Sequence, residues 1–140
     1  IPNFVPDIVQ TPLNVMDQSI ASSGWLTRLS EMNVEVHIRS VFLQGLLLQQ
    51  PHERSVGFSK WSSVFTQFDS WSNAQQMSPL AACIGHVLSY PEVSRVIIGV
   101  TSANELSQII AASSGDHVRA PQSLQVTDVD LIQPMNWNKQ

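Results

Sequence analysis

A short loop after the second apolar run of the sequence has the residue types that could bind a phosphate. Its candidate contact residues are Ser40, Phe42, Gln44 and Gly45. Small side chains and free backbone N–H groups allow an anion to come close to the chain. A purely structural turn explains the loop equally well, because Leu43 and residues 46–48 could simply belong to the core.

A second candidate lies where the third apolar run leads into a helical pattern. Gly99 lies near the end of this run, Thr101 and Ser102 follow, and Glu105 stands three residues after Ser102. A strand that ends in glycine and leads into a helix N-terminus can hold an anion. The spacing of Ser102 and Glu105 is also that of a capping box, so both side chains could do no more than cap the helix.

Three runs rich in Val and Ile must position these loops. They cover residues 7–11, 34–41 and 93–100, and their composition predicts buried strands. Gln10 lies at the end of the first run, and Arg39 lies near the end of the second. Residues at the carboxyl ends of barrel strands commonly face an active site. A polar residue that merely closes a strand is the alternative interpretation.

Helical patterns alternate with these runs. The first covers residues 25–32, and the second contains a one-sided aromatic stripe formed by Trp61, Phe65, Phe68 and Trp71. We interpret this stripe as packing against the barrel and not as an aromatic ligand box. Ser78 and Pro79 predict the start of a third helix. Further helices are expected after Ser102 and at residues 128–131.

The alternation of strands and helices predicts a parallel α/β sheet with right-handed crossovers. An eightfold βα (TIM) barrel needs about 250 residues, whereas the chain has 140. We therefore expect residues 1–140 to form a single partial domain that is a portion of such a barrel. An independent small α/β module has the same pattern and stays open as an alternative.

The composition excludes several kinds of partner. Hydrophobic residues make up 43% and charged residues 13%, as in a globular domain. A net charge of -4 without any Lys/Arg run argues against nucleic-acid and membrane surfaces. Cys83 and His86 alone are too few ligands for a metal site. Residues 1–10 lack a signal-peptide pattern and an initiator Met, so we expect removed residues or a longer protein.

Three segments together resemble the sixth to eighth βα units of the aldo-keto reductase family. They are residues 7–17, 36–48 and 93–106, and the tail at residues 130–137 is similar to the end of many bacterial members. The resemblance implies the C-terminal half of the barrel, with three parallel strands alternating with helices. It also implies a cytoplasmic oxidoreductase that reduces small carbonyl substrates with a nicotinamide cofactor.

The resemblance further implies that the catalytic Asp, Tyr, Lys and His of this family lie outside the chain. The four histidines do not match the catalytic one; they are His37, His52, His86 and His117. We therefore expect the chain alone to be inactive, because no positioned general acid is present. A non-catalytic protein of the same family, used for binding or regulation, is the alternative.

By the same resemblance, the chain carries much of the cofactor-binding half. Gln10 aligns with the partner of the nicotinamide carboxamide, and Arg39 aligns where many members stack an aromatic residue on the nicotinamide ring. The full set of implied cofactor contacts is Gln10, Arg39, Ser40, Phe42, Gln44, Gly45, Gly99, Thr101, Ser102, Glu105 and Gln108. NADP-preferring relatives carry a cation in the turn that here holds Gly99, Thr101 and Glu105, so NAD is favoured over NADP.

A half-barrel also predicts association. Two strand edges and the inward strand faces would lack partners, which favours pairing with a second copy or with the missing half. The apolar residues expected to lose cover are Val9, Val36, Ile38, Ile97 and Val100.

Overall fold

The computed structural model of the protein describes residues 4–139. Its strands are β1 Ile8–Pro12, β2 Glu35–Arg39 and β3 Val93–Val96. Its α-helices are α1 Ser19–Ser22, α2 Trp25–Glu31, α3 Ser62–Ala74, α4 Pro79–Leu88, α5 Ala103–Ser113 and α6 Val129–Ile132. Short 3-10 helices complete the chain as η1 Leu46–Leu48, η2 Val56–Trp61, η3 Gln122–Leu124 and η4 Pro134–Lys139.

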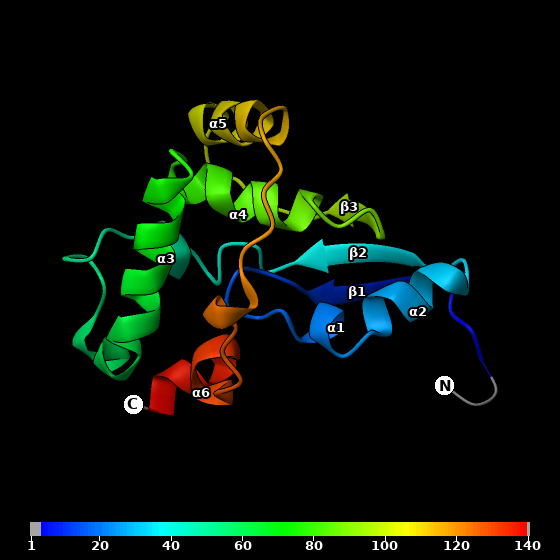
Figure 1. Cartoon of the computed structure of the whole chain (residues 1–140), viewed down its shortest axis with the longest axis horizontal. Coiled ribbons are helices and arrows are strands. Elements are labelled where there is room, and N and C mark those ends of the chain that lie inside the picture. The colour runs from blue at the N-terminus through cyan, green and yellow to red at the C-terminus, as the bar shows by residue number, and fades with distance from the viewer. Residues whose placement is uncertain (1–3, 140) are drawn as a thin grey trace.

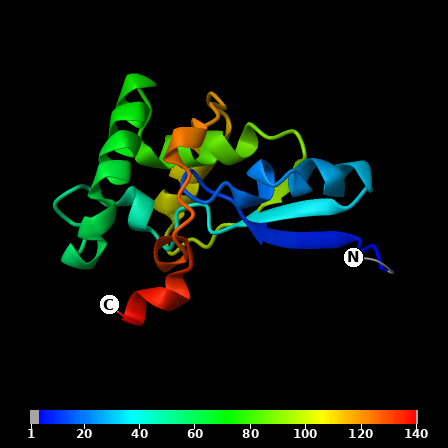
Figure 2. The same ribbon diagram turned by 60° about the horizontal axis from the view of Figure 1, so that its bottom comes forward.

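The three strands form one parallel sheet in the order β1-β2-β3, which confirms the predicted strand order and direction. Val36 lies between Val9 of β1 and Val93 of β3. Figure 1 shows the strands side by side, and in Figure 2 α1, α2 and α4 lie on one side of them, while no helix of residues 4–139 covers the other side. The sheet is therefore open on one face, and its strands end toward α3 and α6.

Alternation along β2 gives the two faces of the sheet different surroundings. Val36 and Ile38 are fully buried beneath the helices, so the expectation that they would lose cover is wrong. Val9 is half-buried against the same core, whereas Ile97 and Val100 are exposed as expected. Side chains in a strand point to opposite faces in turn. The open face therefore holds the residues between them, namely Gln10, Glu35, His37, Arg39 and Arg95.

Two strands end earlier than the apolar runs predict. β2 stops at Arg39 because Ser40 adopts a left-handed backbone conformation with φ of 60°. β3 stops at Val96, although the N–H of Ile97 still donates to the carbonyl of Ile38 at 2.8 Å. Beyond that bond the third run has no strand beside it, because the chain has already turned away at Ser40.

The predicted helix signals are confirmed. The hydroxyl of Ser78 accepts the N–H of Ala81 at 3.2 Å, and Pro79 is the first residue of α4. Phe65 and Phe68 of α3 are buried in the core, as the aromatic stripe predicts. No helix within residues 4–139 is long and apolar enough to cross a membrane.

The C-terminal segment crosses the helix layer and joins the core. Its buried residues are Ala120, Leu124 and Leu131. The N–H of Ala120 donates to Nδ1 of His86 at 3.0 Å, which requires the neutral form of this imidazole. Burial, with a smaller contribution from the charge of Arg119, lowers the pKa of His86 to about 4.

Candidate cofactor-binding site

Two segments at the carboxyl ends of neighbouring strands enclose an open cavity of about 470 Å³. One segment follows β2, and the other joins β3 to α5. The cavity is lined by Ser40, Val41, Phe42, Gln44, Gly45, Leu48, Ile97, Ile98, Gly99, Thr101 and Glu105. Most of the predicted cofactor contacts therefore lie together, although they come from segments more than fifty residues apart.

The segment after β2 is a tight loop with several left-handed residues. Ser40, Leu43 and Gln44 have φ values of 60°, 47° and 55°, and Gly45 has 83°. Residues other than glycine pay about 1–2 kcal/mol for this conformation, so the surrounding structure must hold the loop. Leu43 is fully buried and anchors it in the core, while Gln44 beside it is exposed. The loop therefore presents its polar atoms and backbone to the cavity.

The buried side chain of Asn14 supports this loop through a hydrogen bond to Ser40. The sequence analysis did not identify Asn14 as a site residue. Its side chain is completely buried, and its Nδ2 donates to the carbonyl of Ser40 at 3.0 Å. Its Oδ1 accepts the N–H groups of Met16 and Asp17 at 3.0 and 2.9 Å. An Asn with an Asp three residues later is a turn signal that could have been noticed, but its reach to Ser40 follows only from the tertiary structure.

The turn before α5 is closed by its own side chains. The Ser102 hydroxyl accepts the N–H of Glu105 at 3.1 Å, which confirms the predicted cap. The Glu105 carboxylate accepts the N–H of Thr101 at 2.7 Å and its hydroxyl at 3.1 Å. The bond from this N–H holds the pKa of Glu105 below its ordinary value, so the carboxylate stays charged. An internal anion already occupies the start of this helix.

One cation stands at the edge of the cavity. The guanidinium of Arg39 donates to the Ser40 hydroxyl at 3.1 Å, and this Ser40 also lines the cavity. Arg39 itself is exposed on the open face of the sheet. The site therefore combines the negative Glu105 in its lining with a positive group that is bonded to the lining residue Ser40. Such a site can hold an anion near Arg39 and repels one near Glu105.

Four predicted contacts do not line this cavity: Arg39, which only bonds the lining residue Ser40, and Gln10, Gln108 and Ser102. Gln10 is exposed on the open face beside His37, its register partner in β2. Gln108 points from α5 into a separate depression that it shares with Pro79 and Ala112. The Ser102 hydroxyl accepts the N–H of Glu105 and so caps α5.

The lining offers amides, hydroxyls, glycine backbone and one carboxylate, which suit binding better than proton transfer. Within residues 4–139, no three His, Cys, Asp or Glu side chains gather as a metal site would require. Burial raises the pKa of the Cys83 thiol, and this buried side chain lies in the core. The cavity can therefore hold a ligand but contains no acid–base pair.

No protein-family model and no curated protein matches the sequence significantly. Solved structures do match. An apo-form aldo-keto reductase from Bacillus halodurans aligns with a TM-score of 0.67 and 16% identity, over 81% of this chain and 40% of that chain. A glycerol dehydrogenase from Gluconobacter oxydans aligns with a TM-score of 0.49 and 16% identity, over 81% of this chain and 44% of that one. The chain thus spans less than half the length of either protein. In fold, the chain resembles part of an aldo-keto reductase barrel, with three parallel strands and an open sheet.

Proposed function

We propose that this chain is the cofactor-binding part of a nicotinamide-dependent oxidoreductase that reduces carbonyl compounds. One observation carries the proposal: residues chosen from two distant sequence segments line a single cavity at the carboxyl ends of β2 and β3. In parallel α/β folds, ligands bind at this end of the strands. When bound, the cofactor would supply the hydride, and the chain would supply its position.

The residues fit a dinucleotide in distinct ways. Added Cβ atoms at Gly45 and Gly99 would meet no other atom within 4 Å, so the backbone is open to a ligand at both positions. The hydroxyl of Ser40 and the amide of Gln44 can donate to phosphate oxygens. Arg39 supplies the positive charge that a pyrophosphate requires. These groups would orient the cofactor and exclude water from one side of it.

The turn before α5 favours NAD over NADP. The Glu105 carboxylate already accepts the N–H of Thr101, which a 2′-phosphate would otherwise use. A phosphate placed there would face a like charge and would have to displace this internal bond. We therefore propose that the parent protein binds NADH more tightly than NADPH.

Titration of the full chain with NADH and NADPH, followed by nicotinamide fluorescence, tests both statements. Wild type should bind NADH more tightly, and Glu105→Lys should strengthen NADPH binding by about tenfold or more, equivalent to one favourable charge contact. Glu31→Lys, on an exposed position of α2, is the charge-matched control. Binding of neither nucleotide would contradict the cofactor site, and tighter binding of NADPH by wild type would contradict the preference.

The chain alone should not reduce an aldehyde, because it lacks the Tyr, Lys, Asp and His set implied by the resemblance. Cofactor oxidation by the purified chain would overturn this expectation. A non-catalytic aldo-keto-reductase-like protein, used for binding or regulation, is the second hypothesis, and the cavity in this chain fits both. Activity of a longer protein that carries the Tyr and Lys would distinguish the two.

A further inference from the structure

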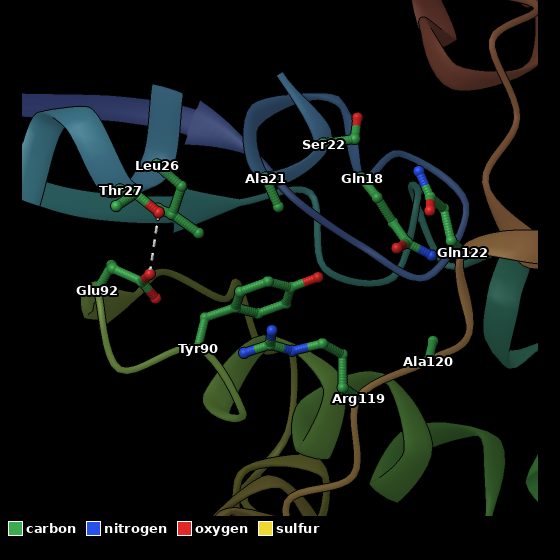
Figure 3. A pocket seen from close by; sticks show the side chains of 10 residues that line it. All are labelled: Gln18, Ala21, Ser22, Leu26, Thr27, Tyr90, Glu92, Arg119, Ala120 and Gln122. Carbon is green, nitrogen blue, oxygen red and sulfur yellow. Dashed lines mark hydrogen bonds between the residues drawn. The ribbon is translucent and has the colours of Figure 1, made fainter. Parts of the chain in front are cut away.

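A second pocket, of about 410 Å³, lies in the helix layer and shares no lining residue with the cofactor cavity. Figure 3 shows its three walls: α1 and α2 form one, the loop before β3 forms another, and the C-terminal segment forms the third. Its volume is within the range of small-molecule sites, about 300–1,000 Å³. Only Ala21, Leu26 and Ala120 in its lining lack a polar side chain, so a ligand must be polar over most of its surface.

The side-chain carbonyl of Gln18 is a fixed acceptor in this pocket. Gln18 is only 5% exposed, and its Nε2 donates to the carbonyls of Val15 and Pro121 at 2.9 and 3.3 Å. These two bonds determine which way the amide faces, and Figure 3 shows its oxygen directed toward the Tyr90 hydroxyl. This oxygen makes no hydrogen bond within residues 4–139, yet it is not sealed from solvent. It is therefore free to accept from a ligand.

The Tyr90 hydroxyl faces this acceptor, and its ring is held on two sides. The guanidinium of Arg119 stacks on the ring, 3.9 Å from its centroid, and the imidazole of His86 meets the ring at 88° with the centroids 5.3 Å apart. The hydroxyl has no partner among the described residues and keeps accessible surface. Burial raises the pKa of Tyr90 above its ordinary value, so the phenol stays protonated and can donate. A free donor thus stands opposite a free acceptor.

The charged groups of the lining are bonded within the protein. Arg119 Nη2 donates to the carbonyl of Ser89 at 2.8 Å, and Glu92 Oε1 accepts the hydroxyl of Thr27 at 3.3 Å. Glu92 Oε2 has no accessible surface, so a ligand in the pocket does not reach it. The lining holds one cation and one anion and has no net charge. This balance favours a neutral ligand over an ion.

We propose that this pocket binds a small neutral molecule with neighbouring hydroxyl groups, such as a polyol or a monosaccharide. One hydroxyl donates to Gln18 Oε1 and accepts from the Tyr90 hydroxyl, since a hydroxyl group can do both. A second hydroxyl pairs with the amide of Gln122, which lines the same pocket. The carbon skeleton lies against the apolar side chains of Ala21 and Leu26. The inference uses none of the cofactor residues and stands whether or not a nucleotide binds.

The test is an NMR titration of the ¹⁵N-labelled full chain with propan-1-ol, propane-1,2-diol and glycerol. These probes share a three-carbon skeleton and carry one, two and three hydroxyl groups. Glycerol should shift the signals of Gln18, Tyr90 and Gln122. Each added hydroxyl should strengthen binding about two- to tenfold, as one net hydrogen bond implies. Xylitol and glucose present the same groups on an open chain and on a ring, so their relative affinity identifies the form that the pocket prefers.

Two substitutions sharpen the result. Tyr90→Phe removes the hydroxyl and keeps the ring that Arg119 stacks on, and Gln122→Met removes the amide. Each should weaken glycerol binding about two- to tenfold. Thr66→Val removes an exposed hydroxyl outside the pocket and should bind as wild type does. Melting curves show whether each variant folds, and the comparison of the three alcohols with the wild-type chain depends on no variant.

Four results would overturn the proposal. The first is no shift at Gln18 and Tyr90 with any polyol or sugar up to about 100 mM, beyond the weak millimolar range, which would leave water as the occupant. The second is equal affinity for propan-1-ol and glycerol, which would indicate an apolar site. The third is tighter binding of acetate or methylammonium than of glycerol. The fourth is unchanged glycerol affinity in a folded Tyr90→Phe variant.

Discussion

The helix-covered face of the sheet and its open face are built from alternate residues of the same strands, yet they differ in chemistry. Val36 and Ile38 have no exposed surface, whereas Glu35 and Arg39 on either side of them are exposed and His37 between them is half-buried. The covered face therefore contributes stability through apolar burial, and the open face presents charge. A half-open sheet remains folded in this chain because its helices complete one hydrophobic core on a single side.

Substitution of two adjacent residues of β2 should give the largest contrast. Ile38→Ala should lower the free energy of unfolding by about 2–5 kcal/mol, because it leaves a cavity in the core. His37→Ala, on the open face, should cost less than about 1 kcal/mol. Urea unfolding at neutral pH measures both. Similar losses at the two positions would show that something else covers the open face.

Acid should weaken the covered side through His86. Because burial lowers its folded pKa to about 4 from 6.5, the folded state binds fewer protons than the unfolded state between these values. The stability from the neutral imidazole is therefore present above about pH 6.5 and is lost as the pH falls toward 4. The pKa difference corresponds to roughly 3 kcal/mol.

Urea unfolding at several pH values checks this expectation. His86→Gln cannot take up the proton, so its stability should fall less steeply than that of wild type over the same interval. Equal slopes for the two proteins would show that other groups govern the acid response.

Asn14 connects the covered core to the cavity and should have an intermediate effect. Asn14→Ala removes the donor to Ser40 and the acceptor for two N–H groups, so it should cost about 1–3 kcal/mol. It should also weaken NADH binding, because the loop after β2 loses its support. Asn73→Ala, on an exposed position of α3, is the matched control. Unchanged NADH affinity in a folded Asn14→Ala variant would show that nucleotide binding does not depend on the support that Asn14 gives to this loop.

The open face should produce the smallest effect, a weak association between copies. The sequence predicted association through exposed apolar side chains, but Val36 and Ile38 are buried. Charged side chains dominate the open face instead. Pairing of Glu35 with Arg95 or Arg39 of a second copy should be screened by salt. Sedimentation at low and high ionic strength measures it. Association that strengthens with salt would instead indicate apolar contact through Ile8 and Ile97.

The sequence could predict the order and direction of the elements, because strand and helix periodicities are local. It also contained the difference between the two faces. Residues 35–39 alternate polar and apolar side chains, which is typical of a half-covered strand. Treating this run as uniformly buried produced the wrong expectation for Val36 and Ile38. β3 ends before the third apolar run does, because the neighbouring chain turns away at Ser40. A local sequence pattern cannot predict such a tertiary effect.

The candidate site was only partly predictable, for the same physical reason. Residues next to strand ends could be selected by type and position, and most of them line one cavity. The left-handed conformation of Ser40 and the support from Asn14 depend on contacts across 26 residues. Gln108 was assigned by alignment alone, and it faces a different depression. No local pattern could predict the pocket between α1, α2, the loop before β3 and the C-terminal segment, because these walls are far apart in the sequence.

The crossing of the C-terminal segment over the helix layer has a consequence for biosynthesis. Val126 donates its N–H to the carbonyl of Met16, and Gln125 bonds the hydroxyl of Ser22 at 2.9 Å. A ribosome releases Met16 and Ser22 about a hundred residues before Gln125 and Val126, so the first loop lacks these partners until the later segment has emerged. During that interval the polar groups around Gln18 and the apolar surface later covered by Leu124 are exposed to solvent and to chaperones. Leu124 and Leu131 therefore complete a core whose first part, around Leu13 and Met16, emerged much earlier in synthesis.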